Sequence, residues 1–389
     1  MRRLQPQRVG DLNTDGPQPR WSASTGEGGW GEIVTTTYVD DLGNTISYEV
    51  AKFDFESVDV GDGVTVSLDG NNPLQLSVVG DATILTSLDL GGMEGTDAGN
   101  DDLMGRLGGG RGGHEWKNSS DPYGPGGGPG NLTTPDYFNA GGKPFSGDVN
   151  PGLATGQEPG GGGYGGIGAR SETGVGNGQY QPVPPGGQTY GDTDITHLFG
   201  GSGGGGGWER SGGTGGGAIK IVTGGTLTIG GDVHAVGGKG GSRPNEARRS
   251  GGSGSGGAIY LKGNQVVINS GVTIRADGGP GATNITGGNT HSTDGGGNGA
   301  AAGGGGRIYI EAVASLVNHE DSTHANVTAD GGFSAGSRHG GVGTVKILRP
   351  QVTELVFSSG SLTIDTDMGT ITHTDGSFLA GTVADRTYT

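Results

Sequence analysis

Residues 256–261 read GGAIYL, a glycine pair that runs directly into a short stretch with strand character. The same junction recurs three more times, as GGGAIKI at 215–221, GGRIYI at 305–310 and GGVGTVKI at 340–347. Three of these four copies lead on to a closing glycine pair, in the segments 235–238, 276–279 and 329–332. One supersecondary unit is therefore reused at a spacing of about 40 to 50 residues, which is typical of stacked repeats.

Apolar and polar residues alternate within each unit. In the unit that begins at residue 218, one face carries Ile219, Ile221, Leu227, Ile229, Val233 and Ala235, and the other carries Lys220, Thr228 and His234. A period of two is typical of strands with one buried face. Short strands separated by turn residues such as Gly224-Gly225 and Gly263-Asn264 suit one coil of a parallel β-solenoid.

The sequence therefore predicts an all-β protein, a parallel β-helix (β-solenoid) with long glycine-rich insertions. We expect Ile219, Ile259 and Ile308 to lie one above another in successive coils. Residues 1–50 are expected to cap the first coil or to reach a neighbouring subunit, with strands at 33–39 and 45–50. The other regions are 51–92, the first coils, then 93–217, a glycine-rich insertion, and 218–389, the repeats and a last coil that includes 355–357, 362–364 and Ile371.

Glycine dominates the insertions. With 94 glycines in 389 residues and 29% hydrophobic residues, the chain suits a thin, elongated core better than a large globular one. Collagen is excluded because the glycines cluster in runs. The tracts are either disordered or packed as extended, polyglycine-II-like strands. Inserts near 239–256, 280–304 and 333–341 leave the coils at the same point, so we expect them to stack into one layer.

The charge of the chain is strongly acidic, at a formal net value of −17. Residues 1–105 hold 18 Asp and Glu against 5 Lys and Arg, which gives −13 and leaves −4 for the remainder. Such a surface is a poor partner for nucleic acid and a better one for divalent cations. The absence of cysteine excludes disulfides and thiolate metal sites.

Segments that could cross a membrane are not found, because none approaches the roughly 18 apolar residues required. The start of the chain, Met1–Leu4, lacks the apolar core of a signal peptide. A leader that has been removed, an export route that needs none, and a protein that is not exported all fit this sequence.

Two stretches are candidate calcium sites, and Ca²⁺ is the only cofactor that the sequence suggests. Asp11, Asn13 and Asp15, followed by Gly16, match the first half of an EF-hand-like loop, which resembles the calcium loop of dockerin modules. Ser22 stands where a bidentate Glu is expected, so an Asx-rich turn is the alternative. The second candidate comprises Asn100 and Asp101, in a stretch that resembles one unit of the RTX calcium nonapeptide.

Catalytic residues are not assigned, nor are residues that would bind an organic cofactor. Glycosidases and lyases on parallel β-helices use clustered carboxylates or Asp, Lys and Arg on one face, whereas Asp and Glu are scattered here. The histidines stand singly, and the glycine-rich stretch 252–257 precedes a strand rather than opening a helix, so it lacks the dipole of a phosphate cradle.

The blocks GGAIYL at 256–261 and VTIRADGG at 272–279 resemble the repeats of glycine-rich, adhesin-like bacterial surface proteins with a parallel β-helix. The glycine tracts resemble the polyglycine-II layers of phage tail-fibre adhesins. The resemblance implies an exported, extended scaffold at the cell surface that binds surfaces, such as cell-surface polysaccharide, or assembles with copies of itself. The unpaired edges at the two ends of a solenoid predict head-to-tail assembly into a filament. The alternatives are a polysaccharide lyase or phage depolymerase on the same fold, and a carbohydrate-binding adhesin without catalysis.

Overall fold

The computed structural model describes residues 9–23, 28–39, 43, 45–96, 103–113, 160–169, 186–207, 210–241, 250–281, 301–318, 324–334, 339–350, 362–365 and 370–373. Every regular element in these residues is a strand. In chain order the strands are β1 (Val9–Asn13), β2 (Arg20–Ala23), β3 (Gly28–Trp30), β4 (Glu32–Val39), β5 (Thr45–Phe55), β6 (Val58–Val60), β7 (Thr65–Asp69), β8 (Leu74–Val78), β9 (Ala82–Ile84), β10 (Leu88–Asp89), β11 (Ala218–Thr223), β12 (Thr226–Ile229), β13 (Val233–His234), β14 (Ala258–Ile268), β15 (Ile274–Arg275), β16 (Arg307–Asn318), β17 (Val327–Thr328), β18 (Thr344–Leu348), β19 (Leu362–Asp365) and β20 (Thr370–His373).

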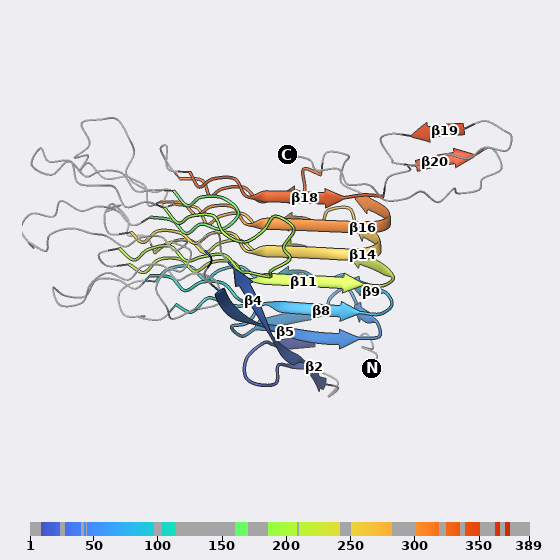
Figure 1. Ribbon diagram of the computed structural model, residues 1–389, viewed down its shortest axis with the longest axis horizontal. Coiled ribbons are helices and arrows are strands. Elements are labelled where there is room, and N and C mark those ends of the chain that lie inside the picture. Colours follow the sequence, from blue (N-terminus) through green and yellow to red (C-terminus); the bar gives the residue numbers. More distant parts are fainter. Residues whose placement is uncertain are drawn as a thin grey trace, which may run out of the picture.

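The longest parallel ladder consists of β5, β8, β11, β14, β16 and β18, each paired with the next. Figure 1 shows these strands one above another, all pointing the same way. Ile219 pairs with Ile259, and Ile259 pairs with Ile308. The predicted all-β fold and the predicted core row are therefore confirmed, and the sheets contain both parallel and antiparallel pairs.

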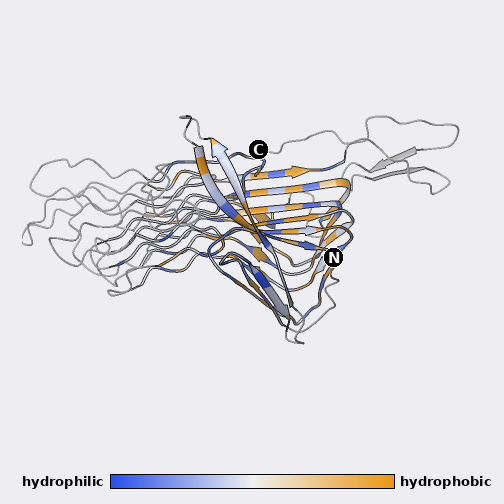
Figure 2. Ribbon diagram, turned by 60° about the horizontal axis from the view of Figure 1, so that its bottom comes forward, coloured by the Kyte–Doolittle hydropathy of each residue, from blue (hydrophilic) through white to orange (hydrophobic). Residues whose placement is uncertain are grey.

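Two further parallel ladders complete the stack. The second ladder runs from β6 through β9 and β12 to the second halves of β14 and β16. The third ladder joins β10, β13, β15 and β17. Apolar side chains from all three ladders meet in one buried cluster. Hydrophobic and hydrophilic residues alternate along the stacked strands in Figure 2, as expected for strands with one buried face.

The turn expected at Gly263 and Asn264 is wrong. Gly263 and Asn264 do not form a turn but lie within β14, where the register shifts between Gly263 and Gln265. The N–H of Asn264 donates to the carbonyl oxygen of Gly225 at 2.9 Å. Because the neighbouring turn supplies this partner, the chain bends through a bulge and stays in the sheet.

The expected last coil is also wrong in part. Strand β18 continues the first ladder, but β19 and β20 pair antiparallel with each other, with Ile364 beside Ile371. Figure 1 shows this hairpin to one side of the stack. Residues 366–369 are too few to make a parallel crossover, so a hairpin forms. Residues 355–357 lie outside the described part of the chain.

The two ends of the stack differ. At the N-terminal end, β4 pairs antiparallel with β5, as expected for a hairpin of 33–39 and 45–50, and β1 pairs in parallel with β7. Strands β2 and β3 extend the sheet of β1 and β7, in the order β3-β2-β1-β7. At the other end, β18 and β17 are the last strands of their ladders, and no strand in the described residues pairs with their outer edges.

The glycine tracts are joined by backbone hydrogen bonds that change direction with a period of three. Along 211–217, the N–H groups of Ser211, Thr214 and Gly217 donate to 90–96, those of Gly212 and Gly215 to 110–113, and those of Gly213 and Gly216 to 252–255. Along 251–257, the N–H groups donate in turn to 235–241, 202–205 and 301–304. The described ends of the predicted inserts therefore pack together, and tracts from the 93–217 insertion join them.

This packing explains the need for glycine. A Cβ atom added at Gly213, Gly216 or Gly254 would overlap backbone atoms of a neighbouring tract. Along 211–217 and 251–257 the residues other than glycine are small and buried, namely Ser211, Thr214, Ser253 and Ser255.

Candidate functional site

The outward face of the first ladder carries a cluster of aromatic and charged side chains, of which the two central ones, Tyr260 and Tyr309, are only 9% and 7% exposed. Strand pairing aligns one outward position on every strand into a row, which we call the outer row, formed by Lys52, Gln75, Lys220, Tyr260, Tyr309 and Lys346. A row of this kind follows from the parallel register, because equivalent residues of stacked strands lie side by side.

Two tyrosines form the centre of the outer row. The rings of Tyr260 and Tyr309 stack with centroids 4.8 Å apart and planes inclined by 8°. A lysine ammonium lies over each outer ring face, with Lys220 Nζ 4.5 Å from the centroid of Tyr260 and Lys346 Nζ 5.5 Å from that of Tyr309. Both distances suit cation–π attraction.

Glu311 supplies the negative charge beside this stack. Its carboxylate accepts a hydrogen bond from Lys262 Nζ at 2.6 Å and from the hydroxyls of Tyr260 and Tyr309 at 3.4 and 3.3 Å. Burial, and then the charge of Glu311, raises the pKa of Tyr260 to about 12 and also raises the pKa of Tyr309. Both phenols therefore stay neutral donors at physiological pH.

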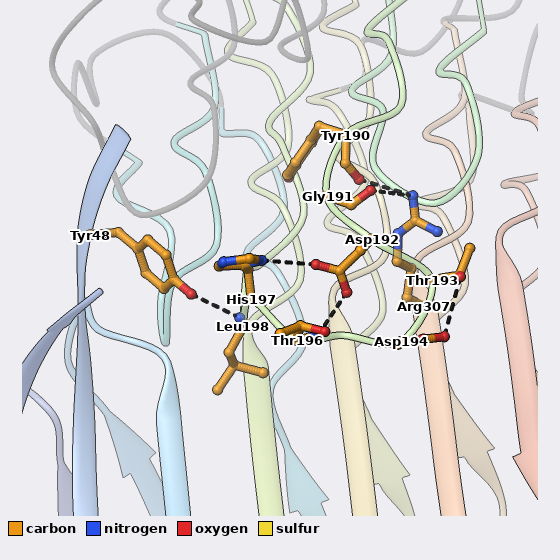
Figure 3. Close-up of polar contacts among 10 residues, drawn as sticks. All are labelled: Tyr48, Tyr190, Gly191, Asp192, Thr193, Asp194, Thr196, His197, Leu198 and Arg307. Atoms are coloured by element: carbon orange, nitrogen blue, oxygen red, sulfur yellow. Dashed lines mark hydrogen bonds and ion pairs between the residues drawn. The ribbon is translucent and has the colours of Figure 1, made fainter. Parts of the chain in front are cut away.

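The segment 190–199 runs across the ladder between Tyr48 of β5 and Arg307 of β16 (Figure 3). Asp192 holds this segment in shape, since its carboxylate contacts His197 Nδ1 at 2.9 Å and accepts from the N–H of Thr196 at 2.7 Å. Asp194 pairs with Lys346 Nζ at 2.7 Å. The N–H of Leu198 donates to the hydroxyl of Tyr48 at 3.2 Å, which ties the segment to β5.

Arg307 of β16 also holds the segment 190–199 in place. Its side chain is buried, and its guanidinium donates to the carbonyl oxygen of Tyr190 at 2.9 Å and to Thr344 Oγ1 at 3.0 Å. The guanidinium also lies 5.3 Å from the ring centroid of Tyr164. Arg307 thus joins β16 and β18 to the aromatic side chains that pack on them.

The carboxylates of this face all have ionic or imidazole partners. Glu311 and Asp194 are each engaged by a lysine, and Asp192 by a histidine. Among the described residues, no carboxylate lies within ion-pair distance of Lys220, and burial lowers the pKa of its ammonium group. Tyr260 and Tyr309 belong to the same buried apolar cluster as Tyr164, Tyr190 and Phe199, so this face packs the segment 190–199 against the ladder.

The residues of the first predicted calcium site lie in β1 and in the turn that follows it. Asp11 and Asn13 lie in β1, which pairs with β7. Asn13 Oδ1 accepts from the N–H of Asp15 at 2.8 Å, and Asp15 Oδ1 accepts from the N–H of Asn71 at 2.6 Å. The first contact is that of an Asx turn, the alternative interpretation, and the second ties the turn to residue 71. Calcium binding at Asp11, Asn13 and Asp15 stays a prediction. Asn100 and Asp101 lie outside the described residues.

Groups of three or more His, Cys, Asp or Glu suited to a metal ion are absent from the described part of the chain. The search of those same residues for a helix long and apolar enough to span a membrane also finds none.

Sequence reasoning missed the outer row, although its signal is present. The position after Ile219, Ile259, Ile308 and Val345 is Lys220, Tyr260, Tyr309 and Lys346 in turn. In-register stacking of these positions follows directly from a repeat. The segment 190–199 carries no comparable signal, because its contact between Tyr48 and Leu198 joins residues 150 positions apart.

Comparison with protein-family models, curated proteins and solved structures finds no match to this chain.

Proposed function

We propose that this chain is an extracellular structural or adhesive protein, built as a parallel β-helix and acting as a self-assembling subunit of a filament or surface appendage. The three parallel ladders around one apolar cluster support the β-helix. The period of three in the hydrogen bonds along 211–217 and 251–257 supports polyglycine-II packing of the tracts, since that extended helix has three residues per turn.

The observation that carries the proposal is the difference between the two ends of the stack. Strands β1 to β4 cover the first strands, whereas β18 ends its ladder without a described partner on its outer side. Val345, at the end of the core row, is only partly buried, although Ile219, Ile259 and Ile308 are fully buried. An open edge of this kind is a template for pairing with another chain.

The partner that suits this edge is another copy of the same chain. Strand β4 at the opposite end pairs only with β5 among the described strands, so it also has an outer edge. Contact between unlike ends is heterologous and gives an open filament unless the rotation closes a ring. The hairpin of β19 and β20 pairs within itself and adds no strand to β18.

Light scattering and electron microscopy of the full chain test this assembly. Val342, 71% exposed just before β18, is replaced by lysine, because an edge lysine opposes strand addition. We expect elongated assemblies from the wild type and at least about tenfold weaker association in Val342→Lys, equivalent to about 1.4 kcal/mol. The control is Val313→Lys, on β16 and 44% exposed, which leaves association unchanged. A wild type that stays monomeric at high concentration rejects the proposal.

A further inference from the structure

A cavity of about 70 Å³, partly open to solvent, lies where the N-terminal strands meet the first strands of the ladders. Leu12 of β1, Trp21 of β2, and Val66 and Leu68 of β7 line it from one sheet, and Phe55 of β5 and Val60 of β6 line it from another. The surface that these and the other lining residues expose to the cavity is entirely apolar. The cavity is thus part of the hydrophobic core that its neighbours do not fill.

Its position follows from the way the core changes at this end of the stack. Further along, the core rows are filled by aliphatic side chains such as Ile221, Leu227 and Ile229, which are fully buried. At the first level, Trp21 meets Phe55 edge to face with centroids 5.9 Å apart, and Phe55 stacks on Phe53 at 6.4 Å. Flat rigid rings cannot follow the contour of their neighbours as aliphatic chains do, so a void remains.

Water is a poor occupant of this cavity. The volume equals the liquid share of about two water molecules, but an ordered water needs two to four polar partners and the walls offer none. Dry apolar cavities in proteins take up small apolar molecules instead. Leu12, Val60 and Val66 are only partly buried, in contrast to the deeper lining residues Leu74, Ile84 and Ile219, so the wall is thinnest at these three side chains.

We propose that this cavity is a binding site for a small apolar molecule, or for the terminal alkyl group of a larger one, which enters between Leu12, Val60 and Val66. The site is independent of the assembly edge at β18 and of the outer row. It would give the capped end of the stack a ligand-binding role of its own.

Xenon is the probe for the test, since it is apolar and of suitable size. Chemical-shift titration of xenon with the full chain should show saturable binding to the wild type. The variant Val66→Phe fills the cavity and should abolish saturation, whereas Val313→Phe makes the same change at an exposed position and should retain it. Circular dichroism checks that each variant keeps its β structure. If Val66→Phe does not fold, Val60→Leu serves as the filling variant.

Benzene provides a second arm that depends on volume. The wild-type cavity is too small for it, but Leu68→Ala enlarges the cavity toward the roughly 150 Å³ at which benzene is accommodated. Benzene should therefore bind Leu68→Ala and not the wild type. A xenon shift that rises linearly without saturation in the wild type, or one that is unchanged in a folded Val66→Phe or Val60→Leu, overturns the proposal.

Discussion

Tyr260 and Tyr309 occupy the same register position on adjacent strands, and their rings stack 4.8 Å apart between two lysine ammonium groups. Both hydroxyls donate to the carboxylate of Glu311. Neutral phenols are required for these hydrogen bonds, because a phenolate beside a carboxylate repels it. The stack therefore makes the stability of the ladder depend on pH in the alkaline range.

We expect the free energy of unfolding to fall as the pH rises from about 10 to about 12. Burial raises the pKa of Tyr48 and of Tyr260 to about 12, whereas tyrosines of the unfolded chain ionise near 10. Between these values the folded state binds more protons than the unfolded state, so stability is lost with increasing pH. Denaturant titration at a series of pH values measures this slope.

The control for the alkaline prediction is the double variant Tyr260→Phe, Tyr309→Phe, in which the slope should become shallower. The pKa of Lys220 is lowered, mainly by burial, and this group acts in the opposite direction because its ammonium form is disfavoured in the folded state. A stability that rises from pH 10 to 12 in the wild type would show that the tyrosines do not dominate.

Ile259→Asp should lower the free energy of unfolding by about 3–5 kcal/mol, because it buries an uncompensated charge. Ile259 lies between Ile219 and Ile308 in a fully buried row. Val313→Asp, at a half-exposed position of β16, is the matched control and should change stability little. Thermal melting distinguishes the two, and a melting temperature of Ile259→Asp within a degree or two of the wild type contradicts the packing described here.

Gly254→Ala should destabilise the protein by about 1–3 kcal/mol, the usual cost of overpacking. A Cβ atom at this position would overlap the carbonyl oxygen of Thr214 in the adjoining tract. Gly61→Ala introduces the same methyl group where no atom lies within 4 Å, so its stability should stay near that of the wild type. Equal stabilities of the two variants would mean that the tracts are not closely packed in solution.

Calcium should bind weakly at Asp11, Asn13 and Asp15, in the submillimolar to millimolar range of extracellular modules, if Asn13 and Asp15 exchange their hydrogen bonds to backbone N–H groups for the ion. Titration calorimetry with the wild type and with Asp15→Ala measures this binding. Heat that is the same in both proteins, or no heat at millimolar calcium, removes the site.

The repeat made much of the fold predictable from the sequence. A single period of two, reset by each glycine tract, determines which residues of β11, β14 and β16 point inward and which neighbours they meet. The bulge at Gly263 was not predictable, because it depends on a hydrogen bond from Asn264 to Gly225 in another repeat. Glycine there has the same local sequence signal whether it forms a turn or a bulge.

The outer face was predictable only in part. The order Lys220, Tyr260, Tyr309, Lys346 can be taken from the repeats alone. The contacts of Asp192 and Asp194 could not be predicted, because the segment 190–199 has no periodic pattern. That segment is held by Arg307 and Tyr48, which are distant in the sequence. An unusual number of aromatic residues among the glycines was the available sign that this insertion packs against something.

The hydrogen bonds along 211–217 restrict which insertions and deletions the glycine tracts can accept. Each N–H is directed at one of three neighbours, and the same neighbour returns at every third residue. Removing a single residue would turn all following N–H groups by a third of a turn and aim them at the wrong tract. Removing three would leave every direction unchanged, so tract lengths in such a protein are free to drift in steps of three, whereas strands that alternate two faces drift in steps of two.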